Sequence, residues 1–415
     1  MSADDTHGSR VHPLYRNRDF ALLVGGHALS TTGDEVSAIA LPLLVLALTE
    51  SASQAGGVAA FQAVPYLLLS LPAGVWIDRW NRKTVMMAAD GVRAVALLSV
   101  PLTYALGILG IPQLYAVAWI TGCAYVFFNV AQIASFERIV PEAQRPRAVS
   151  VNEAAESAGN LLGPGLGGVI VGLGRTQVAG AVLAYLVDAI TFVLSAASLG
   201  AIRRPLRVAR DTAETADVWR ELREGFLFFW RHRELRAIAA TATALNFLFA
   251  PSVLAIIVLA RDELEAPPGA IGLIFSIGAV GGIAGSLLAP ALKSRFRISV
   301  GHILVGSVFA WALGLGVLPA ASTTGVLAAG WVAVAFVGPF YEVFQLSYRL
   351  SVIPPELQGR VHSSFRFLPF GVRPLSLALG GIAIETFGPR PTLTVLAIGM
   401  LLTAVAVARS SVRKL

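Results

Sequence analysis

The sequence predicts an all-α integral membrane protein with twelve transmembrane helices in two pseudo-symmetric six-helix halves. Hydrophobic residues make up 55% of the 415 residues and charged residues 14%, against about 25% charged in a typical soluble domain. Twelve apolar segments follow one another, each near the ~20 residues that a helix needs to cross a bilayer. A constant shift along the chain places Gln132 on Gln345 and Gly167–Gly168 on Gly380–Gly381, as expected if the second half echoes the first.

The apolar segments divide the chain into three expected parts. They occupy residues 20–48, 54–77, 84–108, 112–135, 152–173, 178–201, 236–260, 268–292, 300–320, 325–348, 364–385 and 391–409. We expect a first half with an N-terminal tail over residues 1–201, a connector over residues 202–235 and a second half over residues 236–415. Mean hydropathy is +0.70 over the chain, so the lipid bilayer is an expected partner.

The long connector is expected to contain an amphipathic helix. Its apolar residues recur at helical spacing, namely Trp219, Leu222, Phe226, Phe229 and Trp230. Such a helix can lie in the membrane surface. The simpler alternative, which we favour, is a connecting helix packed under the bundle.

Basic residues gather in alternate connections. If the N-terminus is inside, most arginines and lysines fall in inner connections, and the outer ones carry only Arg175, Arg261 and Arg390. This asymmetry predicts a multi-pass protein of the cell (inner) membrane with cytoplasmic N- and C-termini. It also explains the net charge of +7 without nucleic acid as a partner. Residues 1–19 lack the apolar core of a signal peptide and are expected to form a cytoplasmic tail.

Three motifs connect the chain to a known family. Gly74 to Lys83 fits the pattern G-x-x-x-D-R-x-x-R-K between the second and third segments. Gly159 to Gly168 fits G-x-x-x-G-P-x-x-G-G in the fifth. Together with the two-half layout, they resemble the major facilitator superfamily. The opening Leu14 to Phe20, with Gly33-Asp34 further on, resembles its enterobactin-exporter and macrolide-efflux branch.

Two features depart from the family pattern. Many drug antiporters carry an arginine shortly before a glycine of the fourth helix, but here Ala118 to Thr121 precede Gly122. The second copy of the loop motif, Gly285 to Arg297, has no acidic residue at the position of Asp78. The first departure leaves open how the fourth helix would take part in proton coupling.

The loop after the second segment is expected to form an inner gate. Its residues in that role are Gly74, Asp78, Arg79, Arg82 and Lys83. The carboxylate can face a helix N-terminus of the other half, and the basic residues can pair with inner carboxylates such as Glu137 or Glu142. The alternative is that the basic residues only fix topology.

The fifth segment is expected to present a smooth stripe for helix packing. Gly159, Gly163 and Gly167 recur every four residues and are followed by Gly168, with Pro164 between them. Small residues let helices approach closely in a membrane, and we expect this approach at the interface of the halves. The resemblance marks the motif as typical of exporting, antiport families.

Acidic residues inside the apolar segments are the candidates for proton coupling, because an unpaired charge is costly at membrane depth. They are Asp34, Glu342, Asp188 and Glu35. Asp34 ranks first because it lies in the Gly33-Asp34 pattern. Neighbouring helical residues point about 100° apart, so only one of Asp34 and Glu35 is expected to face the cavity.

Other ionisable residues are expected to be structural. Asp90 and Arg93 are spaced i, i+3 and can neutralise each other. His27 is expected to be a packing histidine.

A substrate cavity is expected between the halves. Its candidate residues are Phe61, Tyr66, Phe127, Asn129, Phe249, Tyr341, Gln345, Arg366 and Arg373. The two arginines are seven residues apart and therefore share a helix face. They can bind an anionic substrate group or neutralise Glu342 or Asp188.

Enzyme and ATPase readings find no support in the sequence. The six histidines show no ligand spacing, there is one cysteine, and no G-x-x-x-x-G-K-[ST] loop occurs, so no metal or cofactor is expected. A proton gradient is the expected energy source. The sequence thus predicts a monomeric, proton-coupled exporter of a small amphipathic molecule, such as a drug, siderophore or secondary metabolite, by alternating access. The alternatives are an importer or facilitator, and a non-transport membrane protein such as a sensor or assembly partner.

Overall fold

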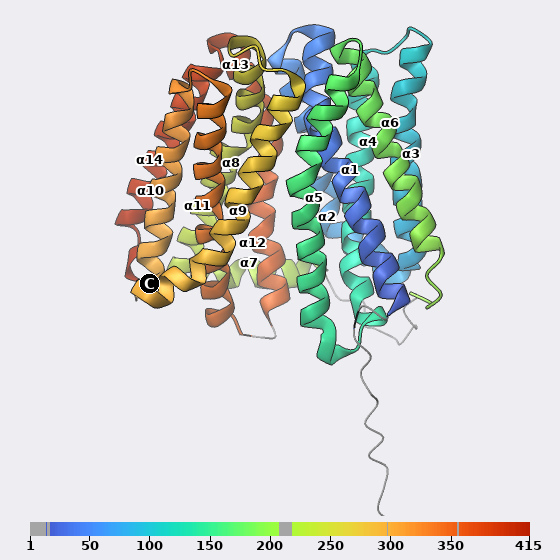
Figure 1. Ribbon diagram of the computed structural model, residues 1–415. Coiled ribbons are helices and arrows are strands. Elements are labelled where there is room, and N and C mark those ends of the chain that lie inside the picture. Colours follow the sequence, from blue (N-terminus) through green and yellow to red (C-terminus); the bar gives the residue numbers. More distant parts are fainter. Residues whose placement is uncertain (1–13, 15–16, 207–217, 297, 355–356) are drawn as a thin grey trace, which may run out of the picture.

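The computed structural model describes residues 14, 17–206, 218–296, 298–354 and 357–415. Most of the N-terminal tail and residues 207–217 of the connector lie outside this description, as does the side chain of Asp78. The described residues are almost entirely helical (Figure 1). The predicted all-α class is confirmed.

Six long helices build each half. Those of the first half are α1 (Arg18–Thr49), α2 (Ala52–Arg79), α3 (Arg82–Ala105), α4 (Ile111–Ile139), α5 (Arg145–Leu173) and α6 (Gln177–Gly200). The second half contains α8 (Arg233–Val258), α9 (Pro268–Phe296), α10 (Val300–Val317), α11 (Thr324–Val352), the pair α12 (Gln358–Gly371) and α13 (Arg373–Phe387), and α14 (Pro389–Arg409). Between the halves lies α7 (Val218–Arg231).

Hydrogen-bonding side chains fix where several helices begin. Asn17, Ser51, Asn81, Thr176 and Thr323 each accept a hydrogen bond from a backbone N–H in the first turn of the helix that follows. These caps satisfy donors that have no partner within the helix. The apolar segments therefore begin at positions that the local sequence itself marks.

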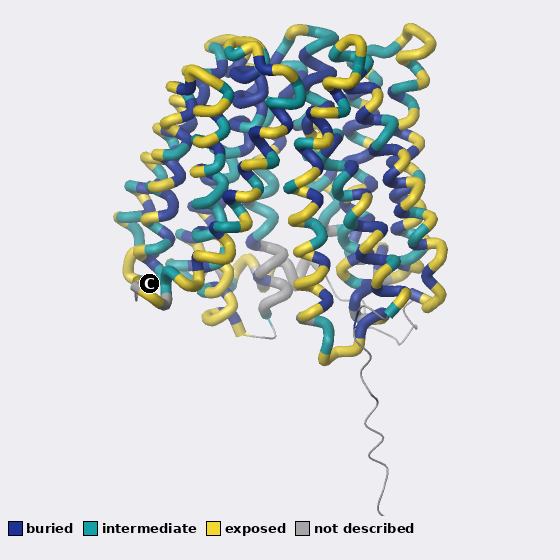
Figure 2. The backbone as a smooth tube through the Cα atoms, viewed as in Figure 1, coloured by how far each residue is buried: buried dark blue, intermediate teal, exposed yellow. Residues whose placement is uncertain are grey.

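Ten helices among the described residues are long and apolar enough to cross a membrane, with Phe365–Phe387 of α12 and α13 counted as one. The remaining two spans are α2 and α5, with 28 and 29 residues, which lie beside the others in Figure 1. Figure 2 shows exposed residues along the outside of the bundle. Many of them are large and apolar, such as Val95 and Leu287, which are 71% and 73% exposed. A surface of this kind is suited to lipid.

The eleventh predicted segment is two helices rather than one. α12 ends at Gly371, and α13 begins at Arg373. Pro369 lies inside α12, and Pro374 lies in the first turn of α13. Each proline lacks the N–H that a continuous helix needs, which explains the break.

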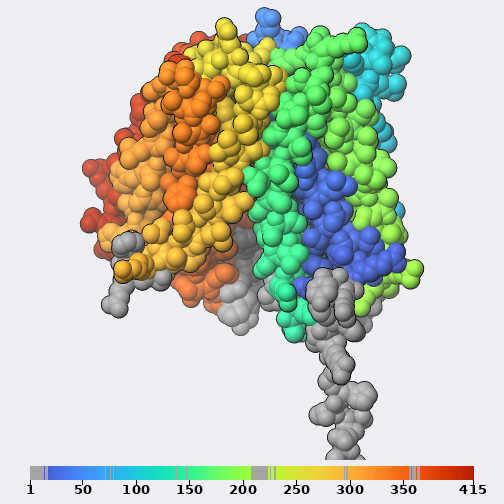
Figure 3. All heavy atoms as spheres, in the orientation of Figure 1, coloured from blue at the N-terminus to red at the C-terminus, as the bar shows by residue number. Residues whose placement is uncertain are grey.

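The two halves meet closely at one end of the bundle. We call the end where α1 begins and α14 ends the terminus end, and the other the far end. Near the far end, a Cβ added to Gly168 of α5 would lie 2.9 Å from the Cα of Gly272 in α9. A Cβ added to Gly56 of α2 would lie 2.8 Å from the Cα of Gly381 in α13. No side chain fits at either crossing, and Figure 3 shows α5 and α9 touching at the far end and separating toward the terminus end.

The connector helix α7 packs against α12 and α8 at the terminus end (Figure 1). Phe226 stacks on Trp230 with ring centroids 5.4 Å apart, and both side chains are exposed. The side chains of Trp219, Leu222 and Phe229 are not described. Whether α7 also lies in a membrane surface stays a prediction.

Candidate functional site

A cavity of about 610 Å³ lies between the halves. That volume is within the range of small-molecule sites. The face of α1 toward the cavity follows helical spacing, with residues 27, 30, 31, 34, 35, 37, 38, 41 and 42 along it. Residues of α2, α3, α4, α5, α6, α8, α12 and α13 complete the lining.

An ion pair between α3 and α1 occupies this cavity. A guanidinium nitrogen of Arg93 binds Oδ1 of Asp34, with 5% of the Arg93 side chain and 32% of the Asp34 side chain exposed. The guanidinium also lies over the ring of Phe192 in α6, 3.9 Å from its centroid. Arg93 was expected to neutralise Asp90, but its direct ion pair is with Asp34 of α1, and it acts on Asp90 only at longer range. Asp90 is fully buried beside Ser195.

A second carboxylate, Asp188 of α6, lies in the same cluster and is only 1% exposed. Ser37 donates its hydroxyl to Oδ2 of Asp188 at 2.5 Å, and the hydroxyl of Thr191 lies 3.3 Å from Oδ1. A Cβ on Gly33 would collide with both Asp188 and Thr191. Gly33 is therefore small because α6 presses against α1 there, which gives a packing reason for the Gly33-Asp34 pattern.

Glu35 also lines the cavity, beside Asp34. Only one of the two had been expected to face it, and this expectation is wrong. The lining covers a broad face of α1 rather than a single row of side chains, so neighbours 100° apart can both reach it. A Cβ on Gly163 would lie only 2.3 Å from the β-carbon of Glu35.

A polar chain crosses the first half beside these carboxylates. Nε2 of His27 lies 2.8 Å from Oε1 of Glu156. The same oxygen accepts a hydrogen bond of 2.7 Å from Asn152, which in turn accepts one from Gln132 at 3.2 Å. His27 also stacks on Phe128 with centroids 5.6 Å apart. It therefore packs as expected, and it also makes a polar contact with Glu156. Sequence reasoning missed Glu156, although an acid inside a predicted spanning segment was a usable signal.

The second half contributes two arginines and an aromatic ring to the lining, namely Arg366, Arg373 and Phe370. The guanidinium carbons of Arg366 and Arg373 lie 5.1 and 5.7 Å from the ring centroid of Phe370. Tyr66 of α2 packs against that ring at 5.3 Å. Tyr66, Asn129, Arg366 and Arg373 are thus the cavity candidates that the structure brings to the lining.

The other predicted residues lie elsewhere. Phe61 packs on Tyr115 and Trp119, Phe127 on Trp76 and Trp80, and Phe249 between Trp311 and Trp331. Tyr341 is buried and donates its hydroxyl to the carbonyl of Ile238 at 3.1 Å. Glu342 is exposed and accepts a hydrogen bond of 2.9 Å from Gln345. None of these predicted residues is among the described cavity lining.

The predicted inner-gate residues hold the terminus end of the first half together. Lys83 donates from Nζ to the carbonyls of Gly200 and Ile202, both at 2.8 Å, a favourable place for a cation at the end of α6. Arg82 is buried and donates to the carbonyl of Ala134 at 2.5 Å. The expected pairing of Lys83 with a carboxylate is replaced by these carbonyl contacts.

The other residues of the loop motif have few contacts that the structure describes. Arg79 is exposed, a Cβ on Gly74 would meet no atom within 4 Å, and the side chain of Asp78 lies outside the described residues.

The glycine stripe of α5 packs mainly within its own half. Cβ atoms on Gly163 and Gly167 would collide with Glu35 and Val36 of α1, and one on Gly159 would lie tightly against Thr31 and Thr32. The stripe was expected at the interface of the halves, and for these three glycines that is wrong. Gly168, one residue on, is the glycine that meets α9 across the interface.

A family profile described as Major Facilitator Superfamily matches residues 23–368. The chain belongs to this superfamily. The resemblance expected from the motifs is confirmed, and the chain is a transporter rather than an enzyme.

Relatives within the superfamily include named efflux proteins. Multidrug efflux pump Tap of Mycobacterium tuberculosis is 26% identical over 405 residues, covering 94% of this chain and 92% of Tap. The MFS-type transporter YfiS of Bacillus subtilis, whose own function is uncharacterized, is 26% identical over 387 residues, covering 91% and 89%. Macrolide efflux protein A of Streptococcus pyogenes is 22% identical over 375 residues, covering 89% and 90%.

Solved structures of the superfamily share the fold. A bacterial homologue of the iron transporter ferroportin in its inward-facing state has a TM-score of 0.76 at 17% identity, covering 96% of this chain and 99% of that one. The outward-facing state of a bacterial ferroportin homologue has a TM-score of 0.61 at 18% identity, covering 94% and 98%. The major facilitator fold predicted from the sequence is confirmed.

Proposed function

We propose that this chain is a proton-driven exporter that moves a small amphipathic molecule out of the cell by alternating access. The observation that carries the proposal is the carboxylate cluster in the central cavity, in which Asp34 is paired with Arg93 and Asp188 lies on the adjoining helix. Burying an acidic side chain at membrane depth costs free energy, so acids found there are candidates for a function such as proton transfer. The efflux proteins among the relatives support the direction of transport.

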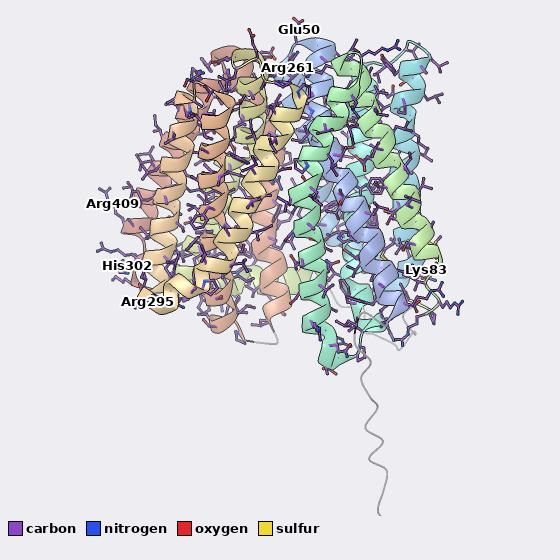
Figure 4. All side chains as sticks on the ribbon, viewed as in Figure 1. Glu50, Lys83, Arg261, Arg295, His302 and Arg409 are labelled. Atoms are coloured by element: carbon purple, nitrogen blue, oxygen red, sulfur yellow. The ribbon has the colours of Figure 1, made fainter. Side chains whose placement is uncertain are left out.

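The terminus end is assigned to the cytoplasm. Lys83 and Arg295 lie there, whereas Glu50 and Arg261 lie at the far end (Figure 4). The inner connections of the sequence carry most of the basic residues, which supports an N-in, C-in orientation in the inner membrane. The connector of residues 202–235 then lies on the cytoplasmic side and joins the half of residues 1–201 to the half of residues 236–415.

On this orientation, the structure corresponds to the inward-open state. The glycine crossings Gly168–Gly272 and Gly56–Gly381 close the cavity at the far end. The higher TM-score with the inward-facing ferroportin homologue agrees with this state. Export then requires these two crossings to part and the terminus end to close, as expected for alternating access around a central site.

Arg93 links the two carboxylates in the proposed coupling mechanism. While Asp34 is ionised, the guanidinium neutralises it. When Asp34 takes up a proton, the ion pair is lost and the guanidinium is free to turn toward Asp188. That movement is short, because the ring of Phe192 beneath the guanidinium lies one helical turn after Asp188. Arg93 of α3 thus supplies the cation that is missing from α4, where Ala118 to Thr121 precede Gly122.

The test uses purified protein in proteoliposomes with a pH-sensitive dye inside. We expect addition of an amphipathic probe, either ethidium or anilinonaphthalene sulfonate, to dissipate an imposed pH gradient. Asp34→Asn is fixed in the neutral form, so it should lose uphill transport and keep probe exchange. Glu35→Gln, on the same face of α1, is the matched control and should keep most of the flux.

Each other outcome selects a different account. Full proton flux in Asp34→Asn would remove Asp34 from coupling and leave Asp188 and Glu342 as the candidates. Probe movement without proton flux in the wild type would replace the antiporter with a facilitator, and accumulation on the cytoplasmic side would make it an importer. An absence of movement for any probe would favour a sensor or assembly partner that has kept the fold.

A further inference from the structure

The cavity is electrically divided between the two halves. The acids Asp34, Glu35, Asp188 and Glu156 all come from α1, α5 and α6. The only cation that α1 to α6 add to the described lining is Arg93, which is already paired with Asp34. Arg366 and Arg373 face the same space from α12 and α13.

Neither of these two arginines is paired within the part of the chain that the structure describes. Neither guanidinium takes part in an ion pair or hydrogen bond of the described residues, and both lie against the ring of Phe370. Glu153 of α5 attracts Arg366 only at longer range. Two guanidiniums within 6 Å of one ring centroid repel each other, and a cation–π contact offsets only part of that cost. An anion bound between the two guanidiniums would remove this repulsion.

The helix break explains why the arginines can share one ring. Arg366 precedes Phe370 by one helical turn, and Arg373 follows Gly371 and Val372, where α12 gives way to α13. Phe370 itself is fixed by Tyr66 from the other half, with centroids 5.3 Å apart. The two rings are tilted by 43° to each other and add an apolar surface next to the two cations.

We propose that this cavity binds an amphipathic organic anion. Its carboxylate, phosphate or sulfonate group lies between Arg366 and Arg373, and its apolar ring lies against Phe370 and Tyr66. Guanidinium groups bind such oxyanions through paired, charge-assisted hydrogen bonds. This inference rests on the proposed export function for its biological meaning but not for its test, which measures binding alone.

The experiment compares two probes that differ by one charged group. Anilinonaphthalene sulfonate and phenylnaphthylamine share an aromatic skeleton, and only the first is an anion. Binding of each is titrated to the purified full chain in phosphatidylcholine nanodiscs, which offer no anionic lipid headgroup. In the wild type, the anion is expected to bind about tenfold or more tightly than the neutral probe, as charge-assisted hydrogen bonds to two guanidiniums imply.

The variants separate charge from shape. Arg366→Gln and Arg373→Gln should each weaken binding of the anion by about tenfold and leave the neutral probe unchanged. Phe370→Leu should weaken the binding of both probes. Arg409→Gln is the control, because it removes the same charge from an exposed site on the outer side of the bundle, away from the cavity, and should change the binding of neither probe.

Two results would overturn the inference. The first is equal affinity of the wild type for both probes, and the second is that the arginine variants lose binding of the neutral probe as well as of the anion. If the glutamine variants do not fold, the wild-type comparison and Arg366→Lys, which keeps the charge but not the planar fork, still decide the question. Charge-selective binding without proton-coupled transport would retain this site and reject the exporter. Proton-coupled transport without charge-selective binding would retain the exporter and reject this site.

Discussion

Gly168 of α5 packs backbone to backbone against Gly272 of α9. Gly56 and Gly381 repeat that contact between α2 and α13. The internal echo of the sequence, which places Gly167–Gly168 on Gly380–Gly381, is therefore more than a trace of duplication. It marks the two equivalent points at which the halves touch at the far end.

The crossing of α5 and α9 yields a first prediction. Gly272→Val should push α9 away from α5 and open the far end, because a Cβ there would collide with the backbone of Pro164 and Gly168. We expect a cysteine introduced at Ala55, in a Cys123→Ser background, to become more reactive toward a membrane-impermeant thiol reagent added from the far side. Gly269→Val is the control, since a Cβ at Gly269 meets no atom within 4 Å. Equal reactivity in both variants would remove the closing role of this crossing.

A second prediction concerns the contact of α5 with α1. Gly163→Leu should displace α1 at Glu35 and so move Asp34 away from Arg93. We expect the variant to reach the membrane at normal amounts but to lose efflux by at least tenfold. Gly172→Leu, on the same helix but in open space, should transport normally. Normal efflux by Gly163→Leu would show that this close approach does not position the carboxylates.

The spanning helices could be predicted from the sequence because each is determined by residues that are close together in the chain. Runs of about 20 apolar residues fix them, and Asn, Ser and Thr caps fix several of their starts. The early start of α5 at Arg145 was not predicted, because its first turns are polar and hydropathy alone does not mark them. The break at Gly371 could have been anticipated from Pro369 and Pro374.

The site could be predicted only in part. Asp34, Asp188, Arg366 and Arg373 stood out, because charges in apolar segments are rare whatever their partners are. Their partners depend on helix packing, so the local spacing of Asp90 and Arg93 indicated the wrong ion pair. Aromatic residues carried no such signal, since Phe249 and Tyr341 serve packing as readily as they would line a cavity.

The N-terminal signature residues yield a third prediction. Both carboxylate oxygens of Asp19 accept backbone N–H groups, from Arg203 at 3.1 Å and Arg204 at 3.2 Å. Asp19→Ala leaves these donors without their partner and should lower stability by about 1–3 kcal/mol. The measurement is thermal unfolding of the purified protein in detergent, with Glu142→Ala at an exposed site as the control. If both variants unfold at the same temperature, Asp19 does not anchor the end of α6.

The last prediction separates the structural role of Arg93 from its role in coupling. Arg93→Gln leaves the carboxylate of Asp34 without its cation in a largely buried place, and removal of one partner from a buried pair is strongly destabilising. We therefore expect this single variant to unfold at a clearly lower temperature than the wild type. Arg93→Gln combined with Asp34→Asn removes both charges and should recover most of the lost stability, because the two residues are coupled neighbours.

Transport should not recover with stability. The double variant has a neutral, hydrogen-bonding pair in place of the ion pair, so it can bind and exchange a probe but has no proton to release at Asp34. Thermal unfolding and substrate-driven proton flux in proteoliposomes, measured on the wild type and on both variants, give the two readouts. Proton flux in the double variant at the wild-type rate would contradict the mechanism and assign coupling to Asp188. A double variant as unstable as the single one would instead show that Arg93 is held by its stacking on Phe192, and not by its charge.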